Sequence, residues 1–83
     1  PTGSIEGSIT DQTGAVVAGA TVTITETATG RAVTATTNDE GFFTVRNLQP
    51  GVYAVKVEKE GFKVSTLENL TVLVGQVARA DVG

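Results

Sequence analysis

Short alternating segments separated by turn residues dominate this chain. Gly, Asp and Asn gather about every 8–12 residues, and the intervals between them alternate apolar with polar side chains. The clearest interval is "VYAVKVEKE" at residues 52–60. Its Tyr53, Val55 and Val57 fall on one face, because successive side chains of a strand point to opposite sides. No interval has the apolar spacing of an amphipathic helix. The chain is therefore predicted to be all-β.

The same alternation predicts the remaining strands and the residues that face the core. Residues 31–38 are rich in Thr and weakly apolar, so we place this strand at a sheet edge or on a solvated face. Residues 47–51 are predicted to form a loop that inserts Leu48 into the core, residues 63–69 are ambiguous, and Phe62 is expected to pack against the core. The predicted inward set is Ile5, Gly7, Ile9, Val17, Val22, Ile24, Phe43, Val45, Leu48, Tyr53, Val55, Val57, Leu70, Val72 and Val74. Seven or eight short strands with this turn spacing are typical of a β-sandwich.

The composition argues against an enzyme. The 83 residues include no His and no Cys. This removes the commonest general base, thiol nucleophiles and the usual zinc ligands. Two carboxylate pairs exist, Asp39 with Glu40 and Glu58 with Glu60, but we expect both to be solvated surface. The sequence therefore predicts no catalytic residues and no cofactor.

The acidic turn "NDEG" at residues 38–41 has two interpretations. In the first, Asn38 and Asp39 favour turn geometry and Gly41 takes a positive φ. In the second, a weak calcium site draws on oxygen ligands from two loops, because hard cations bind several oxygens. Its candidate ligands are Asp11, Asn38, Asp39 and Glu40. The spacing differs from that of an EF-hand loop, so we expect a turn and no bound metal.

Composition also limits the binding partners. With six Lys and Arg residues and a net charge of −3, the chain lacks the clustered positive charge that nucleic acids require. No apolar run approaches the about 20 residues of a membrane-spanning helix, so we expect no direct membrane insertion.

An exposed edge within residues 63–74 is a candidate for pairing with a strand of another protein. Sugar-binding modules present aromatic platforms, and Phe42 is the one candidate for an exposed aromatic binding residue.

Three stretches of the chain have the pattern of a known domain family: "GSITDQTGAVVAGATVTI" (7–24), "TNDEGFFTVRNLQPGVYAVKVEKEGF" (37–62) and "LTVLVGQ" (70–76). They resemble carboxypeptidase regulatory-like domains. The resemblance rests on a combination of turn and core residues, namely Gly7, Asp11, Gly14, Gly19, Ala20, Val22, Asp39, Gly41, Phe43, Leu48, Pro50, Gly51, Tyr53, Gly61 and Phe62. It implies a seven-stranded antiparallel Greek-key β-sandwich of the transthyretin-like, immunoglobulin-like type, with residues 1–83 forming a single domain.

The resemblance also implies a role. Such domains serve as non-catalytic structural or interaction modules of larger bacterial cell-envelope or extracellular proteins, for example as N-terminal extensions of TonB-dependent outer-membrane receptors or as surface-protein repeats. The alternative is a carbohydrate- or ligand-binding accessory module of a secreted enzyme such as a carboxypeptidase. The expected location is the periplasm, the outer membrane or the extracellular space, and the expected partners are neighbouring domains. Because the chain starts "PTGS" and contains no Met, we expect it to be a piece of a longer protein or to begin with residues left over from a tag.

Overall fold

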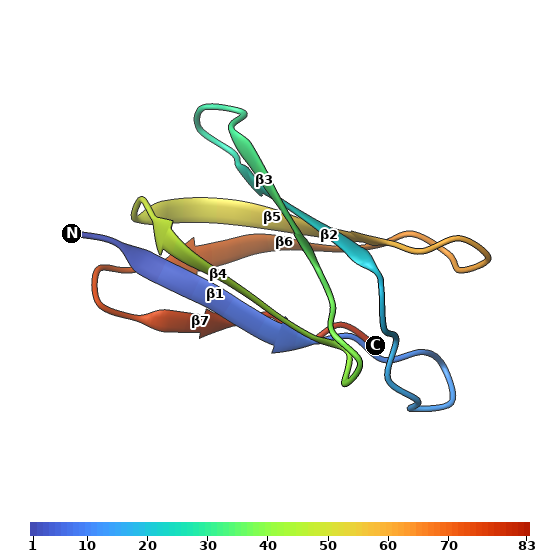
Figure 1. Ribbon diagram of the computed structural model, residues 1–83. Coiled ribbons are helices and arrows are strands. Elements are labelled where there is room, and N and C mark those ends of the chain that lie inside the picture. Colours follow the sequence, from blue (N-terminus) through green and yellow to red (C-terminus); the bar gives the residue numbers. More distant parts are fainter.

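Two β-sheets face each other in the computed structural model, which describes all of residues 1–83 (Figure 1). The smaller sheet has the strand order β4-β1-β7 and the larger has the order β3-β2-β5-β6. The strands are β1 (Gly3–Ser8), β2 (Thr21–Glu26), β3 (Ala32–Thr36), β4 (Phe42–Leu48), β5 (Gly51–Glu58), β6 (Ser65–Val72) and β7 (Val77–Arg79). This confirms the predicted seven-stranded sandwich. Neighbouring strands pair antiparallel, except that β1 and β7 pair in parallel. The structure contains no helix that could cross a membrane.

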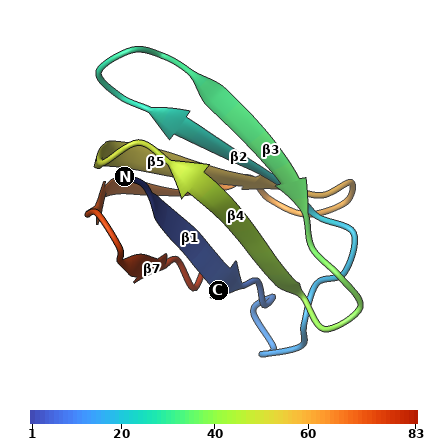
Figure 2. The ribbon, with the colours of Figure 1, turned by 60° about the vertical axis from the view of Figure 1, so that its left-hand side comes forward.

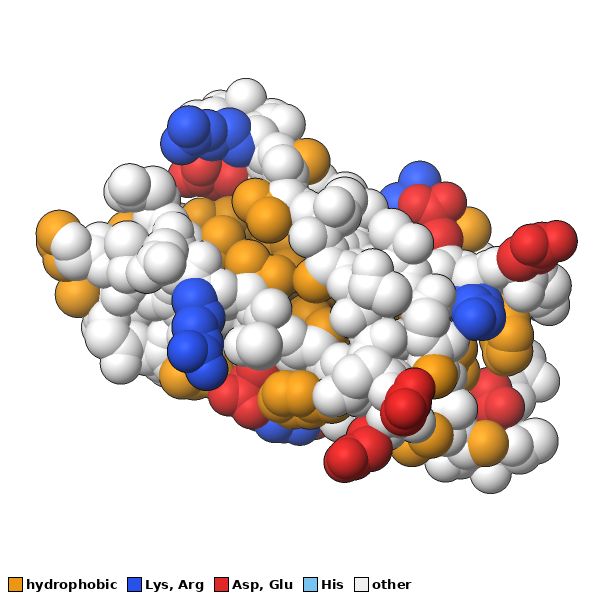
Figure 3. Space-filling view, in the orientation of Figure 1, with side chains coloured by type: hydrophobic (Ala, Val, Ile, Leu, Met, Phe, Trp, Pro, Cys, Tyr) orange, Lys and Arg blue, Asp and Glu red, His pale blue; other side chains and the backbone are white.

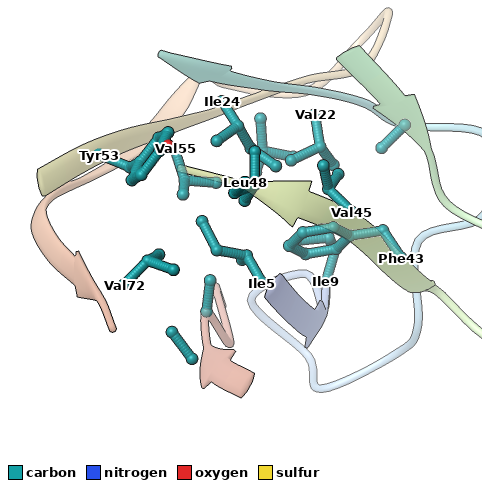
Figure 4. Close-up of a cluster of buried hydrophobic side chains, with 14 of the residues drawn as sticks. Ile5, Ile9, Val22, Ile24, Phe43, Val45, Leu48, Tyr53, Val55 and Val72 are labelled. Carbon is teal, nitrogen blue, oxygen red and sulfur yellow. The ribbon is translucent and has the colours of Figure 1, made fainter. Parts of the chain in front are cut away.

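The core lies between the two sheets and forms one cluster of 15 buried side chains (Figure 4). Most of the predicted inward residues are buried there: Ile5, Ile9, Val17, Val22, Ile24, Phe43, Val45, Leu48, Tyr53, Val55, Val57 and Val72. Each fully buried aliphatic side chain contributes about 1.5–3 kcal/mol relative to an exposed one. The alternation read from the sequence therefore supplies most of the apolar burial that stabilises the fold.

Gly7 is inward, as predicted, and the structure shows why this position has no side chain. A Cβ at Gly7 would lie 2.0 Å from the carbonyl oxygen of Ala80. The C-terminal segment runs this close because the Ala80 N–H donates a hydrogen bond to the Glu6 carbonyl. A glycine in β1 thus lets the last residues of the chain pack directly onto the first strand.

Leu48 is buried as predicted, but it belongs to a strand and not to a loop. β4 continues to Leu48 and β5 begins at Gly51, so the connection is shorter than the expected 47–51 loop. Asn47 has a φ of 61°, and the β1–β4 register shifts beside it, between the pairs made by Gly3 and Ile5. This bulge turns Leu48 inward while the strand continues.

Residues 65–69 of the ambiguous region 63–69 belong to a strand, and the inward assignment of Val74 is wrong. β6 runs from Ser65 to Val72, with Leu67 and Leu70 partly buried against the core. Val74 is 58% exposed. The chain has already turned there, because the Gln76 N–H donates to the Leu73 carbonyl and Gly75 takes a φ of 71°.

The expected packing of Phe62 against the core is also wrong. Phe62 is 48% exposed. The β5–β6 ladder reaches only to the pair of Val57 with Ser65, so the loop that joins these strands extends beyond the last paired residues. A turn in which the Phe62 N–H donates to the Lys59 carbonyl holds the ring outside the core.

Candidate functional site

Three connections gather at the end of the sandwich where the chain terminates: the β1–β2 segment, the β3–β4 turn and the β5–β6 loop (Figure 1). A hollow at this end, here called the loop-end pocket, lies between the first and third of these connections. Its lining combines apolar and polar side chains, including Asp11, Gln12, Phe62, Lys63 and Val82. It brings the one strongly exposed aromatic ring next to a carboxylate, an amide and an ammonium group. These are the group types that bind small polar ligands.

Asp11 stabilises the turn that forms one wall of this pocket. Its Oδ1 accepts hydrogen bonds from the Thr13 N–H at 2.8 Å, the Thr13 hydroxyl at 2.6 Å and the Ala15 N–H at 3.1 Å. These bonds, led by the Thr13 hydroxyl, lower the pKa of Asp11 because they favour the charged carboxylate. The Gly14 N–H donates to the Asp11 carbonyl and closes the turn, and Gly14 has a φ of 87°.

The acidic turn after β3 adopts the predicted turn geometry. The Asn38 Oδ1 accepts hydrogen bonds from the Glu40 N–H at 2.9 Å and the Phe42 N–H at 3.0 Å. The Gly41 N–H donates to the Asn38 carbonyl, and Gly41 has a φ of 74°. The side-chain oxygen that a cation would need from Asn38 is therefore engaged by the backbone of its own turn.

The four calcium candidates lie in two separate turns at this end of the molecule. Asp11 belongs to the β1–β2 segment, whereas Asn38, Asp39 and Glu40 belong to the β3–β4 turn. Nowhere do three or more His, Cys, Asp or Glu side chains come together in a group that could hold a metal ion. Calcium binding stays a hypothesis, and melting curves with calcium and with chelator would test it.

The aromatic side chains are arranged differently from the sequence prediction. Phe42, the predicted exposed aromatic, is half-buried at the start of β4. Phe43 and Tyr53 are core residues. The exposed ring is that of Phe62, which sequence reasoning placed against the core. The position of Phe62 after the turn glycine Gly61 was the available signal, because a residue in a loop beyond the strand ends has no opposing sheet to cover it.

A second hollow opens between the sheets on the side of β3 and β4, where Figure 3 shows apolar atoms at the surface. Ile24, Val33, Leu48 and Tyr53 contribute its apolar wall, and Glu26, Arg31, Asn47 and Gln49 contribute polar groups. The Tyr53 hydroxyl donates to the Gln49 carbonyl. Burial, followed by the charge of Glu26, raises the pKa of Tyr53, so this phenol is neutral at physiological pH. Its hydroxyl serves as a hydrogen-bond donor within the wall of the hollow.

A family model described as carboxypeptidase regulatory-like domain matches residues 4–83. No protein of curated function matches the sequence. One similar solved structure is a Bacteroides uniformis protein described as a proposed carbohydrate-binding protein, with a TM-score of 0.76 and 25% identity. The match covers 99% of this chain and 40% of that one.

A second similar structure is chlorocatechol 1,2-dioxygenase from Pseudomonas putida. Its TM-score is 0.71 at 15% identity, and the match covers 95% of this chain and 58% of that one. At this level of identity the likeness shows a shared fold alone. This chain therefore spans less than two thirds of either structure.

Proposed function

Because the chain belongs to the carboxypeptidase regulatory-like domain family, we propose that it is a non-catalytic structural and interaction module of a larger bacterial cell-envelope or extracellular protein. An N-terminal extension of a TonB-dependent receptor and a surface-protein repeat are the two settings that fit best. Neighbouring domains of the parent protein are its proposed partners. Nucleic acid is not a proposed partner, and we propose no direct insertion into the membrane.

The placement of the termini is the observation that carries this proposal. The first and last strands, β1 and β7, pair in parallel, so the chain enters at one end of the sandwich and leaves at the other (Figure 1). The two ends are tied down: the Gly75 N–H donates to the Thr2 carbonyl, and Val82 bridges Ile9. Such an arrangement suits a rigid spacer joined in series with other domains.

The interior also favours a scaffold over an enzyme. No buried side-chain nitrogen or oxygen lacks a hydrogen-bond partner. Active sites commonly retain strained or unpartnered polar groups that await a substrate. Here the single buried polar residue, Thr37, is fully engaged by the backbone.

Cell fractionation followed by immunoblotting would test the proposal, with antibodies raised against this chain and cells that produce the natural protein. We expect an immunoblot band larger than the chain itself, in the envelope fraction or the culture medium. A band confined to the cytosol would contradict the proposed location, and a band the size of the chain alone would contradict the proposed parent protein.

The second candidate is a carbohydrate-binding accessory module. It is favoured by the exposed Phe62 ring in the loop-end pocket and by the similarity to the Bacteroides uniformis protein. It ranks second because sugar sites usually present more than one aromatic platform. NMR titration with a panel of oligosaccharides would show shifts around Phe62, and Phe62→Ala would abolish them while Phe42→Ala would not. No shifts with the wild-type chain at about millimolar ligand would exclude binding of those sugars in the affinity range of such modules.

A further inference from the structure

The larger sheet ends on one side in β3, and this strand lacks the features that usually keep a sheet edge from pairing with another chain. Its sequence, Ala-Val-Thr-Ala-Thr, contains neither charge nor Pro. Its register against β2 runs from Thr21–Thr36 to Thr25–Ala32 without a bulge. Charged side chains, prolines, bulges and very short strands are the common protections of an edge.

The other three edges of the sandwich are protected. β6 carries Glu68 and a register shift against β5. β4 carries Arg46 and its own shift against β1. β7 has only three residues and includes Arg79. Figure 2 shows β3 as the outermost strand of its sheet. It is the one regular, uncharged edge in the molecule.

The hydrogen bonds at both ends of β3 reveal which backbone groups face outward. The Glu26 N–H donates to the Arg31 carbonyl, and the Thr37 N–H donates to the Ala20 carbonyl. In an antiparallel ladder, residues that bond to one neighbour alternate with residues whose N–H and C=O point the other way. The residues that direct their backbone groups to the free edge are therefore Ala32, Thr34 and Thr36.

We infer that this edge pairs with β3 of a second copy of the chain, antiparallel and centred on Thr34. Ala32 of each copy then faces Thr36 of the other, and each facing pair can exchange two hydrogen bonds. Val33, which is 44% exposed, comes to lie beside Ala35 of the other copy. The pairing removes apolar surface from water and joins the two larger sheets into one continuous sheet.

Charge selects a second copy as the partner. Arg31 directly precedes β3, and Asp39 follows it in the acidic turn. Neither side chain has an ion-pair partner within the chain, since its salt bridges involve other residues. Antiparallel pairing brings Arg31 of each copy to the acidic turn of the other, and the two-fold axis repeats this contact. Parallel pairing would instead place the two arginines side by side.

The association should be weak and dependent on concentration. A strand of five residues buries far less than the about 800 Å² per partner of a standard interface. We expect a dissociation constant on the order of 100 µM. Sedimentation velocity between about 10 µM and about 1 mM covers this range and reports the dimer directly.

Two charge variants test whether the partner is a second copy of the chain. Arg31→Glu and Asp39→Lys each make both symmetric contacts repulsive, so each alone should weaken the dimer about tenfold or more. An equimolar mixture of the two should restore it, because each copy then supplies the charge that the other lacks. Lys63→Glu and Glu60→Lys are the matched controls: they change the charge equally on the exposed β5–β6 loop and should leave association unchanged.

Thr34→Pro tests the strand itself. The Thr34 N–H faces the free edge, so Pro leaves the bonds to β2 intact and blocks only the new pairing. We expect a monomer with an unchanged circular dichroism spectrum. If this variant does not fold, the two charge variants alone test the inference. Three results would each overturn the inference. The wild-type chain could be monomeric at about 1 mM, or the dimer could persist in folded Thr34→Pro. The equimolar mixture of Arg31→Glu and Asp39→Lys could also fail to restore association.

Discussion

A single hydroxyl ties the irregular segment before β2 to the end of β3. Thr37 is 4% exposed and is the one buried polar residue of the chain. Its Oγ1 donates to the Val17 carbonyl at 2.7 Å and accepts from the Ala20 N–H at 2.8 Å. The sequence predicted that Val17 faces inward, but it did not single out Thr37. A run of similar threonines contains no local signal for which hydroxyl becomes buried.

We expect Thr37→Val to lower the free energy of unfolding by about 1–3 kcal/mol, because it leaves the Ala20 N–H and the Val17 carbonyl without partners while preserving shape. Urea denaturation followed by circular dichroism would measure this change. The neighbouring Thr36→Val is the control: it lies on the exposed side and should change stability by less than about 0.5 kcal/mol. Equal stability of the two variants would contradict the bridging role.

At the scale of whole strands, two asparagines break the alternation in the same way. Asn47 in β4 and Asn69 in β6 have φ values of 61° and 60°, and each strand has a register shift beside its asparagine. The local sequences are alike, "VRNL" at 45–48 and "LENL" at 67–70. In both, inward residues are three apart instead of two. This shared pattern was the signal that could have extended β4 and defined β6 from sequence.

The left-handed backbone conformation at these bulges should determine how much a substitution of the asparagine changes the stability. Asn69 is exposed, so replacing it removes few contacts. Asn69→Gly should keep the stability within about 0.5 kcal/mol, whereas Asn69→Val should cost about 1–2 kcal/mol because a β-branched side chain is strained at this φ. Thermal unfolding of the two variants side by side measures the difference. If Val were tolerated as well as Gly, the bulge would not depend on the left-handed conformation.

For the molecule as a whole, the contact between the first and last strands completes the smaller sheet. β7 pairs in parallel with β1, and Ala78 and Ala80 join the core. Arg79 adds an ion pair to Glu6 at 2.9 Å, which is partly exposed and so contributes little by itself. Without β7 the smaller sheet would be a two-stranded ribbon, which is marginal in water.

We therefore expect a chain truncated after Gln76 to lose its fold. It would lack β7, uncover one edge of β1 and expose the core beneath Ala78 and Ala80. Proton–nitrogen correlation spectra would show collapsed amide dispersion. Removal of Pro1 alone, an exposed residue outside β1, is the control and should leave the spectrum dispersed. A truncated chain with native dispersion would show that β1 and β4 are stable without their neighbour.

The sequence by itself determined where most strands run, which of their faces turn inward and where tight turns form. These properties depend on neighbouring residues: alternation sets the buried face, and Asp11, Asn38 and Gly41 define their turns through local bonds and backbone angles. The acidic turn could thus be assigned from four residues.

Only the tertiary structure decided which strands meet and what lies outside the core. The parallel contact of β1 with β7, the exposure of Phe62 and the openness of the β3 edge all depend on segments distant in the chain. Arg79 and Glu6, which meet on neighbouring strands of the smaller sheet, are 73 positions apart. Backbone hydrogen bonds between strands are the same for almost every residue, so the local pattern specifies a face but not a partner. The partner follows from how the two sheets close over one shared core.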